Sequence, residues 1–180
     1  MGVMELLLPL VERARDGDRA AFGDLHARFA RPVYLALVGL LRRREDAEDA
    51  WQVTFLAAWR HLPRLRRADR FPGWLFRIAR NAARDVAQRR KRFPAALPDA
   101  SDLVARPNGF PAPPSAADPL PALVGELRPE TRALVLLRAV EGWSAEEVAA
   151  AFSWSASTVR RRYARALALL RARLVERNGS

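Results

Sequence analysis

The 180-residue sequence contains no cysteine, two histidines and a single lysine, Lys91. Without cysteine the chain has no disulfide, no thiol chemistry and no cysteine-ligated zinc, which agrees with a reducing compartment. The two histidines, His26 and His61, have no catalytic or metal-binding residues near them in the sequence, and we expect both at the surface or at the boundary of the core. We therefore expect no catalytic residues, no metal and no other cofactor.

Long hydrophobic runs are also missing. The apolar residues 6–11 are too few to cross a membrane, include Pro9, and follow Glu5 rather than a positively charged segment. The sequence has no internal repeat of fixed period. These absences predict a cytoplasmic protein that carries no secretion signal and does not insert directly into a membrane.

Positive charge, by contrast, is present in excess. The chain has 31 basic and 20 acidic residues, which give a net charge of +11. Residues 1–92 alone hold 20 basic and 11 acidic residues, so most of the excess lies in the first half. A basic balance of this size indicates nucleic acid or another acidic surface as the partner. Half of the residues are hydrophobic, so the chain can also bury a core.

Residues 46–92 carry the most information. Apolar residues at Ala47, Trp51, Phe55 and Trp59 recur with the period of a helix that has one wide apolar face. The acidic residues of its first turn complement the helix dipole, and with a glutamine one turn later they also suit a docking face for a basic partner. This candidate docking face consists of Asp46, Glu48, Asp49 and Gln52.

A basic loop and a second helix follow. Pro63 ends the first helix, and Pro72 suits the first turn of the next one, which we expect to run to about Arg90. Its apolar stripe consists of Phe71, Trp74, Leu75, Ile78, Ala82 and Val86. Arginines in the loop and off this stripe suit single-stranded nucleic acid, although a solvated basic surface is the simpler alternative. The candidates are Arg64, Arg66, Arg67, Arg70, Arg77, Arg80, Asn81 and Arg84.

This stretch resembles region two of the extracytoplasmic-function (ECF) sigma factors, which belong to the sigma-70 family of RNA polymerase subunits. The shared patterns are D-A-E-D with Q-x-T-F and A-W after it, and then F-x-x-W-L-x-x-I-A-R-N. Val53 departs from the family, which usually has an acid at that place. The resemblance implies that the acidic docking face binds polymerase, and that the arginine group captures the melted minus-ten element of a promoter.

The flanking sequence predicts the domain organisation. We expect a short helix ended by Gly17, and then a longer helix that Asp18 caps and Pro32 kinks or splits. Residues 93–121 contain eight prolines and almost no amphipathic period, which is typical of a flexible connector. A structureless stretch of this length is uncommon within one compact domain. We therefore predict two domains, residues 1–92 and 120–180, joined by a linker of residues 93–119.

The C-terminal segment has the pattern of a helix-turn-helix. A helix begins near Pro129, Gly142 ends it, and Ser144 with Glu147 forms the capping box of a short second helix. A tight turn without glycine leads to a long third helix, whose first residues can enter the major groove and contact bases and phosphates. The alternative is a solvated basic helix. The candidate contacts are Ser155, Ser157, Thr158, Arg160, Arg161, Arg162 and Arg165.

Residues 120–174 resemble sigma region four, from the L-P start through S-x-x-T-V-x-x-R and R-A. The serine and tryptophan of the turn depart from the family, which commonly has glycine and an aliphatic residue there. The two resemblances together imply an all-α, two-domain sigma subunit that directs transcription initiation by binding core polymerase and promoter DNA. The C-terminal helix would read the minus-thirty-five element. We expect no small-molecule substrate, and we expect an anti-sigma factor that holds the protein inactive.

Two other functions fit parts of the sequence. A stand-alone transcription regulator would use the helix-turn-helix to bind an operator as a dimer, with half-sites about one helical turn apart. A general nucleic-acid packaging protein would fit the charge but not the acidic docking helix, and would bind without sequence preference. The order region two, linker, region four favours the sigma factor.

Overall fold

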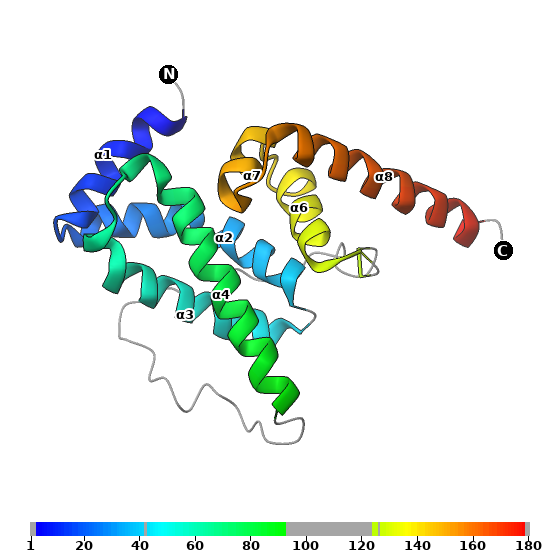
Figure 1. The fold of residues 1–180 in the computed structure, drawn as a ribbon, viewed down its shortest axis with the longest axis horizontal. Helices are drawn as coiled ribbons and strands as arrows, with labels where there is room; N and C mark the ends of the chain where they lie inside the picture. Colours follow the sequence, from blue (N-terminus) through cyan, green and yellow to red (C-terminus); the bar gives the residue numbers. More distant parts are fainter. Residues whose placement is uncertain (1–2, 42, 93–123, 126, 179–180) are drawn as a thin grey trace.

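The computed structural model describes the backbone of residues 3–41, 43–92, 124–125 and 127–178, and the side chains within these ranges from Leu7 to Arg173. Throughout these ranges the chain forms helices and connecting turns without a strand (Figure 1). The prediction of an all-α fold is therefore confirmed. The predicted linker of residues 93–119 lies outside the described residues.

The N-terminal half is a helical bundle. Its elements are α1 (Val3–Arg15), α2 (Arg19–Leu40), α3 (Arg44–His61), the 3-10 turns η1 (Leu62–Arg64) and η2 (Ala68–Arg70), and α4 (Phe71–Arg92). As predicted, Asp18 caps α2, because its carboxylate accepts hydrogen bonds from the backbone N–H groups of Ala20 and Ala21. The helix α2 continues through Pro32 and is not split.

Aromatic side chains fill the centre of this bundle. Trp51 of α3 is fully buried, and its indole N–H donates a hydrogen bond to the Ala30 carbonyl of α2 at 2.8 Å. Its ring packs at 5.1 Å from that of Phe55, while Phe29 of α2 contacts Phe71 at the start of α4. These contacts join α2, α3 and α4 into one core.

The position of His26 differs from the prediction. This side chain is only 6% exposed and lies edge-on to Trp51 and within 4.4 Å of the Phe55 ring, so the expectation of a surface or boundary residue was wrong. It follows Leu25 on α2, on a face that α3 covers, and the sequence period alone placed it off the apolar stripe. His61, in contrast, is exposed as expected. Burial disfavours the imidazolium and lowers the pKa of His26.

This burial predicts a pH dependence of stability. The unfolded chain binds a proton at His26 below pH 6.5, the ordinary pKa of histidine. The folded chain binds this proton only at lower pH, because burial lowers the pKa of His26. The stability that the neutral, buried His26 contributes is fully present above pH 6.5 and is lost as the pH falls toward the pKa of His26 in the folded chain. Urea unfolding between pH 8 and pH 5 should show a loss of stability below pH 6.5 that His26→Gln reduces. The matched variant His61→Gln should keep the full pH slope; equal slopes in the wild type and His26→Gln would contradict the assignment.

The C-terminal half consists of α6 (Pro129–Ala139), α7 (Ala145–Phe152) and α8 (Ala156–Asn178). The predicted capping box is present at the start of α7. The Ser144 hydroxyl accepts a hydrogen bond from the backbone N–H of Glu147, and the Glu147 carboxylate accepts one from the backbone N–H of Ser144. Gly142 has φ +69° at the end of the preceding turn. Ser153, in the turn between α7 and α8, also adopts the left-handed conformation, with φ 57° and ψ 41°. Glycine would adopt this conformation with less backbone strain than serine does.

The helices of the two halves pack against each other. The helix α6 lies on the C-terminal half of α2, and α7 lies on α4, as the adjoining ribbons show (Figure 1). As a result α2 is buried nearly all round from Pro32 to Leu41, and one hydrophobic core includes side chains of both halves. The far end of α8 projects away from this body (Figure 1).

Candidate nucleic-acid interface

The predicted docking face lies on α3, and its four residues have different surroundings. Glu48, Asp49 and Gln52 are half-buried, and Glu48 accepts a hydrogen bond from Arg44 at 2.6 Å. Asp46 is only 7% exposed and forms an ion pair with Arg90 of α4 at 2.6 Å. Asp46 therefore ties the start of α3 to the end of α4 in this structure.

The loop arginines lie on the two 3-10 turns between α3 and α4 and on the residues that join these turns. Arg64, Arg66, Arg67 and Arg70 are all exposed. Asp69 lies between two of them, with its carboxylate 2.7 Å from the Arg67 guanidinium and 3.7 Å from that of Arg70. The hydrogen bond from Arg67 lowers the pKa of Asp69, so this carboxylate stays charged and organises the turn.

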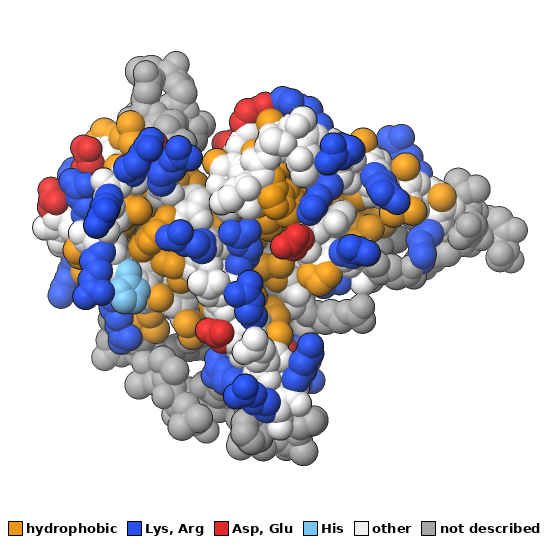
Figure 2. Space-filling view, viewed as in Figure 1, with side chains coloured by type: hydrophobic (Ala, Val, Ile, Leu, Met, Phe, Trp, Pro, Cys, Tyr) orange, Lys and Arg blue, Asp and Glu red, His pale blue; other side chains and the backbone are white. Residues whose placement is uncertain are grey.

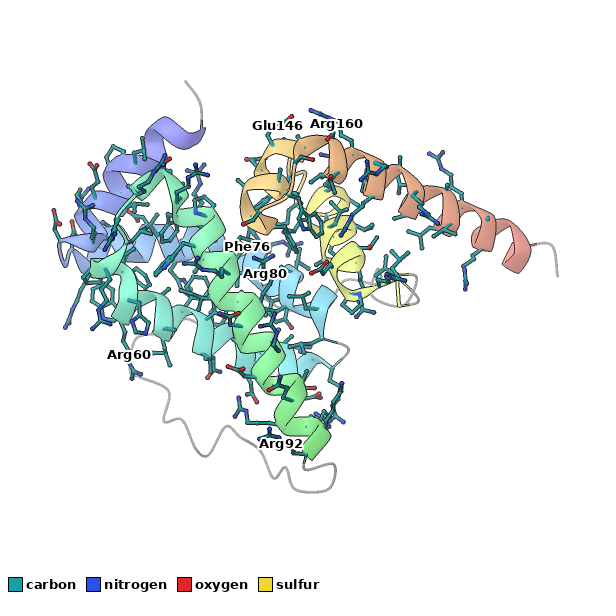
Figure 3. All side chains as sticks on the ribbon, viewed as in Figure 1. Arg60, Phe76, Arg80, Arg92, Glu146 and Arg160 are labelled. Carbon is teal, nitrogen blue, oxygen red and sulfur yellow. The ribbon has the colours of Figure 1, made fainter. Side chains whose placement is uncertain are left out.

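The polar residues predicted on α4 do not all share one environment. Arg77, Asn81 and Arg84 are exposed along the helix. Arg80 instead donates to the backbone carbonyl of Phe152 in α7 at 3.1 Å, with its guanidinium carbon 5.7 Å from the Phe152 ring centre. In Figure 3 the labelled Phe76 and Arg80 lie on the part of α4 that faces α7.

The start of α8 has a dense set of hydroxyl groups. The Ser155 hydroxyl accepts from the Thr158 backbone N–H at 3.2 Å and caps the helix. It also lies 3.0 Å from the Ser157 hydroxyl and 2.9 Å from that of Thr158. Ser155 and Ser157 are exposed, so the cap and the predicted contact surface coincide.

The arginines of α8 fall into two groups. Arg160 pairs with Glu146 of α7, and the two side chains lie together at the top of Figure 3. The guanidinium carbon of Arg162 lies 4.3 Å from the ring centre of Trp154, and a guanidinium nitrogen lies 3.5 Å from the Glu130 carboxylate. Arg161 and Arg165, by contrast, are exposed, and neither side chain forms an ion pair or a cation–π contact with the residues that the structure describes.

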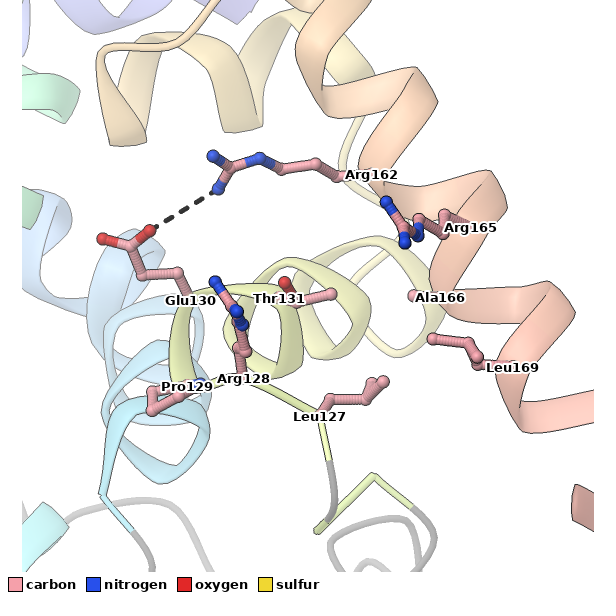
Figure 4. Close-up of a pocket in the computed structure, with 9 residues that line it drawn as sticks. All are labelled: Leu127, Arg128, Pro129, Glu130, Thr131, Arg162, Arg165, Ala166 and Leu169. Atoms are coloured by element: carbon pink, nitrogen blue, oxygen red, sulfur yellow. Dashed lines mark ion pairs between the residues drawn. The ribbon is translucent and has the colours of Figure 1, made fainter.

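A groove of about 670 Å³ separates α8 from the start of α6 (Figure 4). Its basic side chains come from both helices, and the exposed Leu169 adds an apolar surface. The lining residues are Leu127, Arg128, Pro129, Glu130, Thr131, Arg162, Arg165, Ala166 and Leu169. Among the described residues that line the groove Glu130 is the single acid, and it pairs across the groove with Arg162 (Figure 4).

Basic side chains dominate the face shown in Figure 2, over α4 and along α8. Such a surface attracts phosphates, and arginines at the start of an exposed helix can reach base edges in the major groove. In the ranges that the structure describes, no group of three or more acidic or histidine side chains is arranged to hold a metal ion. None of the described helices is both long and apolar enough to span a membrane.

Comparison with known proteins identifies the family. Sigma-70 region 2 matches residues 25–93 and Sigma-70 region 4 matches residues 117–170. The RNA polymerase sigma factor CarQ of Myxococcus xanthus is 39% identical over 168 residues, which cover 92% of this chain and 96% of CarQ. The chain belongs to the sigma-70 family.

Further relatives support the ECF group within this family. The ECF RNA polymerase sigma-E factor of Salmonella typhimurium is 32% identical over 87% of this chain and 88% of its own length. The solved structure of CnrH in complex with the cytosolic domain of CnrY matches with a TM-score of 0.67 and 30% identity, covering 94% of this chain and 97% of CnrH. The predicted membership of the ECF sigma factors and the function as a sigma subunit are therefore confirmed.

Several residues that shape this sigma factor were missed by sequence reasoning. Arg132 of α6, which the sequence pattern did not single out, is 4% exposed and donates to the Gly39 carbonyl of α2 at 2.6 Å. Phe76 lies off the predicted stripe of α4, yet it is 1% exposed because it packs on Trp143 and Phe152. A second bulky apolar residue directly after Leu75 was the one signal of a second buried face.

Proposed function

We propose that this sigma factor binds core polymerase through α3 and binds a promoter through α4 and α8. The observation that carries the proposal is the sequential match to sigma regions two and four on one chain, with exposed arginines on the helices of both. Neither region supplies a nucleophile or a phosphate-binding loop, and the proposed role is recognition without catalysis. Promoter melting is then driven by binding energy.

In the docking of polymerase, the four acidic and amide side chains of α3 have two roles. Glu48, Asp49 and Gln52 are the residues proposed to face a basic surface of the polymerase. Asp46 contributes through its ion pair with Arg90, which fixes the angle between α3 and α4 and keeps the docking helix in place relative to the DNA-binding helix. The exposed Val53 adds an apolar contact within the same surface.

Each half of the chain binds one element of the promoter DNA. The exposed loop arginines and Arg77, Asn81 and Arg84 of α4 capture the melted minus-ten strand, since basic side chains bind its phosphates and unstacked bases. Arg80 belongs to this group once it is released from Phe152. The start of α8, from Ser155 to Arg165, enters the major groove of the minus-thirty-five element.

We also propose a protein inhibitor as a further partner. The related CnrH was solved in complex with the cytosolic domain of CnrY, and this chain matches CnrH over nearly the whole length of both. An anti-sigma factor that binds this chain in a similar way would keep it from polymerase. A pull-down from the native cell that recovers polymerase and no inhibitory protein would contradict this part of the proposal.

The test of the proposed function is reconstitution with bacterial core polymerase. The full chain should co-elute with core polymerase on gel filtration and should direct transcription from promoters in a library that share one upstream motif. Failure to co-elute, together with tight sequence-specific binding of the free chain to duplex DNA as a dimer, would instead identify a stand-alone regulator.

Replacing Arg161 with alanine should separate promoter recognition from polymerase binding. Arg161 is exposed at the start of α8, and the loss of one arginine contact to a base or phosphate should reduce promoter-dependent transcription by roughly tenfold. Association with core polymerase should be unchanged. The matched control is Arg171→Ala, an exposed arginine farther along the same helix, which should retain activity. Equal losses for both variants, or a parallel loss of core binding, would refute the role of this helix end.

A further inference from the structure

Four exposed residues form one stripe along the start of α8. Ser157, Arg160, Arg161 and Ala164 lie three or four positions apart, so they are neighbours on one side of the helix, and all four are exposed. Val159, which is fully buried, lies on the side of the helix that faces the core. Two arginines therefore stand next to each other at the centre of the surface proposed to enter the major groove.

These two arginines have different surroundings. Arg160 donates a hydrogen bond from Nη2 to the carboxylate of Glu146 in the first turn of α7, and Figure 3 shows the two labelled side chains together. Arg161 forms no ion pair with the residues that the structure describes. The guanidinium of Arg160 is thus held from a second helix, whereas that of Arg161 is not.

Stability does not explain the ion pair between Arg160 and Glu146. Both side chains are 62% exposed, and an exposed ion pair contributes little to stability because water screens its charges. The helices α7 and α8 are already joined by the buried side chains of Val148, Phe152 and Val159. The effect of the pair is local: it orders a long side chain that would otherwise sample many rotamers.

The carboxylate also changes what Arg160 offers to DNA. The charges of Arg160 and Glu146 cancel, so the pair attracts phosphates only weakly. The contact with Glu146 uses one N–H of the guanidinium, and the other N–H groups remain for acceptors. The O6 and N7 atoms of guanine form a pair of acceptors that matches a guanidinium. An arginine that is held in place and nearly neutralised is therefore suited to a base edge rather than to a phosphate.

The neighbouring arginines are suited to other contacts. Arg161 and Arg165 are exposed and keep their full charge, which favours phosphates, because phosphate contacts supply affinity without requiring one fixed geometry. Arg162 lies off the stripe and pairs with Glu130 of α6. Of the arginines on the exposed stripe, Arg160 is thus the one that an acidic residue holds in place.

We propose that the pair of Arg160 and Glu146 sets the base preference at one position of the minus-thirty-five element, where Arg160 donates to O6 and N7 of a guanine. Glu146 is a positioning residue, which holds the guanidinium in the orientation that meets the base edge. Arg161 and Arg165 bind phosphates and carry no sequence information. The inference rests on the function proposed above and adds the base that the C-terminal half selects.

Transcription from a promoter library tests the assignment. Each position of the minus-thirty-five region is varied in turn, and the wild type with core polymerase should prefer guanine by about tenfold or more at one of them. The double variant Arg160→Ala/Glu146→Ala, which keeps the net charge, should lose this preference and no other, at unchanged helical circular dichroism. Arg161→Ala should weaken all sequences by a similar factor and keep the preference. A double variant that still prefers guanine would overturn the proposal.

The single variant Glu146→Ala tests the positioning role. It should lower the guanine preference by about threefold, because Arg160 then has to be ordered on binding. Binding to unrelated sequences should rise, since a negative charge near the phosphates is lost. Glu130→Ala is the matched control, because Glu130 pairs with an arginine off the stripe, and it should keep the preference. A uniform rise on all sequences with an unchanged preference would show that Glu146 only repels DNA, which would also overturn the proposal.

The dependence of binding on salt separates phosphate contacts from base contacts. Arg161→Ala should reduce the slope of log affinity against log salt by about one, whereas Arg160→Ala/Glu146→Ala should leave this slope unchanged. A slope reduced by about one in the double variant would place Arg160 on a phosphate and contradict the assignment. If the wild type directs no transcription with core polymerase, the proposed sigma function fails instead. The same library, screened as duplex DNA against the free chain, then decides whether Arg160 selects guanine.

Discussion

Replacing Trp51 with alanine should lower the free energy of unfolding by about 3–5 kcal/mol, as expected for a large aromatic side chain removed from a packed core. Trp51 is fully buried between α2 and α3. The substitution would remove ring contacts with His26 and Phe55 and would leave the Ala30 carbonyl without its indole donor. A loss of this size is a large part of the total stability of a small protein. Urea unfolding followed by circular dichroism measures it.

The same helix provides the control for this substitution. Trp59 lies two turns after Trp51, is half-buried, and contacts Phe22 with the ring centres 4.9 Å apart. Trp59→Ala should cost clearly less than Trp51→Ala, because much of that side chain already faces solvent. Equal losses for the two variants, or a loss below about 1 kcal/mol for Trp51→Ala, would show that Trp51 is not the centre of the N-terminal core.

Replacing Arg132 with alanine should weaken the contact between the halves by about 2–4 kcal/mol, since it removes charge-assisted hydrogen bonds to buried carbonyls. One acceptor is the Gly39 carbonyl in the last turn of α2, where carbonyls have no partner within the helix. The last turn of α2 has no basic residue of its own, so Arg132 supplies from α6 the positive charge that a helix C-terminus favours. The helix α2 is thus completed by a residue far along the chain.

The measurement for Arg132 is the shape of the unfolding curve as well as its midpoint. The wild type, with one core across both halves, should unfold in a single transition. Arg132→Ala should unfold at lower urea concentration, and its tryptophan fluorescence and helical circular dichroism should no longer change together. Arg128→Ala is the control, because Arg128 is exposed at the start of the same helix. A single transition with an unshifted midpoint in Arg132→Ala would contradict the proposed role of this residue.

Most of the helices were predictable because their signals are local. The capping carboxylate of Asp18, the capping box of Ser144 and Glu147, and the period of the apolar residues all act within a few positions of the chain. The tight turn without glycine was also predicted, and Ser153 in this turn adopts the left-handed conformation that glycine adopts with less strain. The roles of the individual site residues stay predictions until the polymerase experiments are made.

The second faces of α2 and α4 were not predictable in the same way. The stripe on α4 correctly included Phe71 and Leu75, but Phe76 lay off that stripe, and only the packing of α7 and Trp143 explains its burial. Arg80 looked like one more member of the basic face, and its hydrogen bond reaches 72 residues along the chain. A period of 3.6 residues shows which side of a helix is apolar and does not show what a second partner covers.

The sequence by itself determined the helices, their caps, the excess of positive charge and the motifs of sigma regions two and four, because each of these depends on residues close together in the chain. Only the tertiary structure decided that Asp46 pairs with Arg90, that Arg132 completes α2 and that Arg80 is held against α7. These pairings join residues that are 44 to 93 positions apart. Their energy depends on how whole helices pack, and helix packing is set by the shapes of two surfaces rather than by the residues of either one.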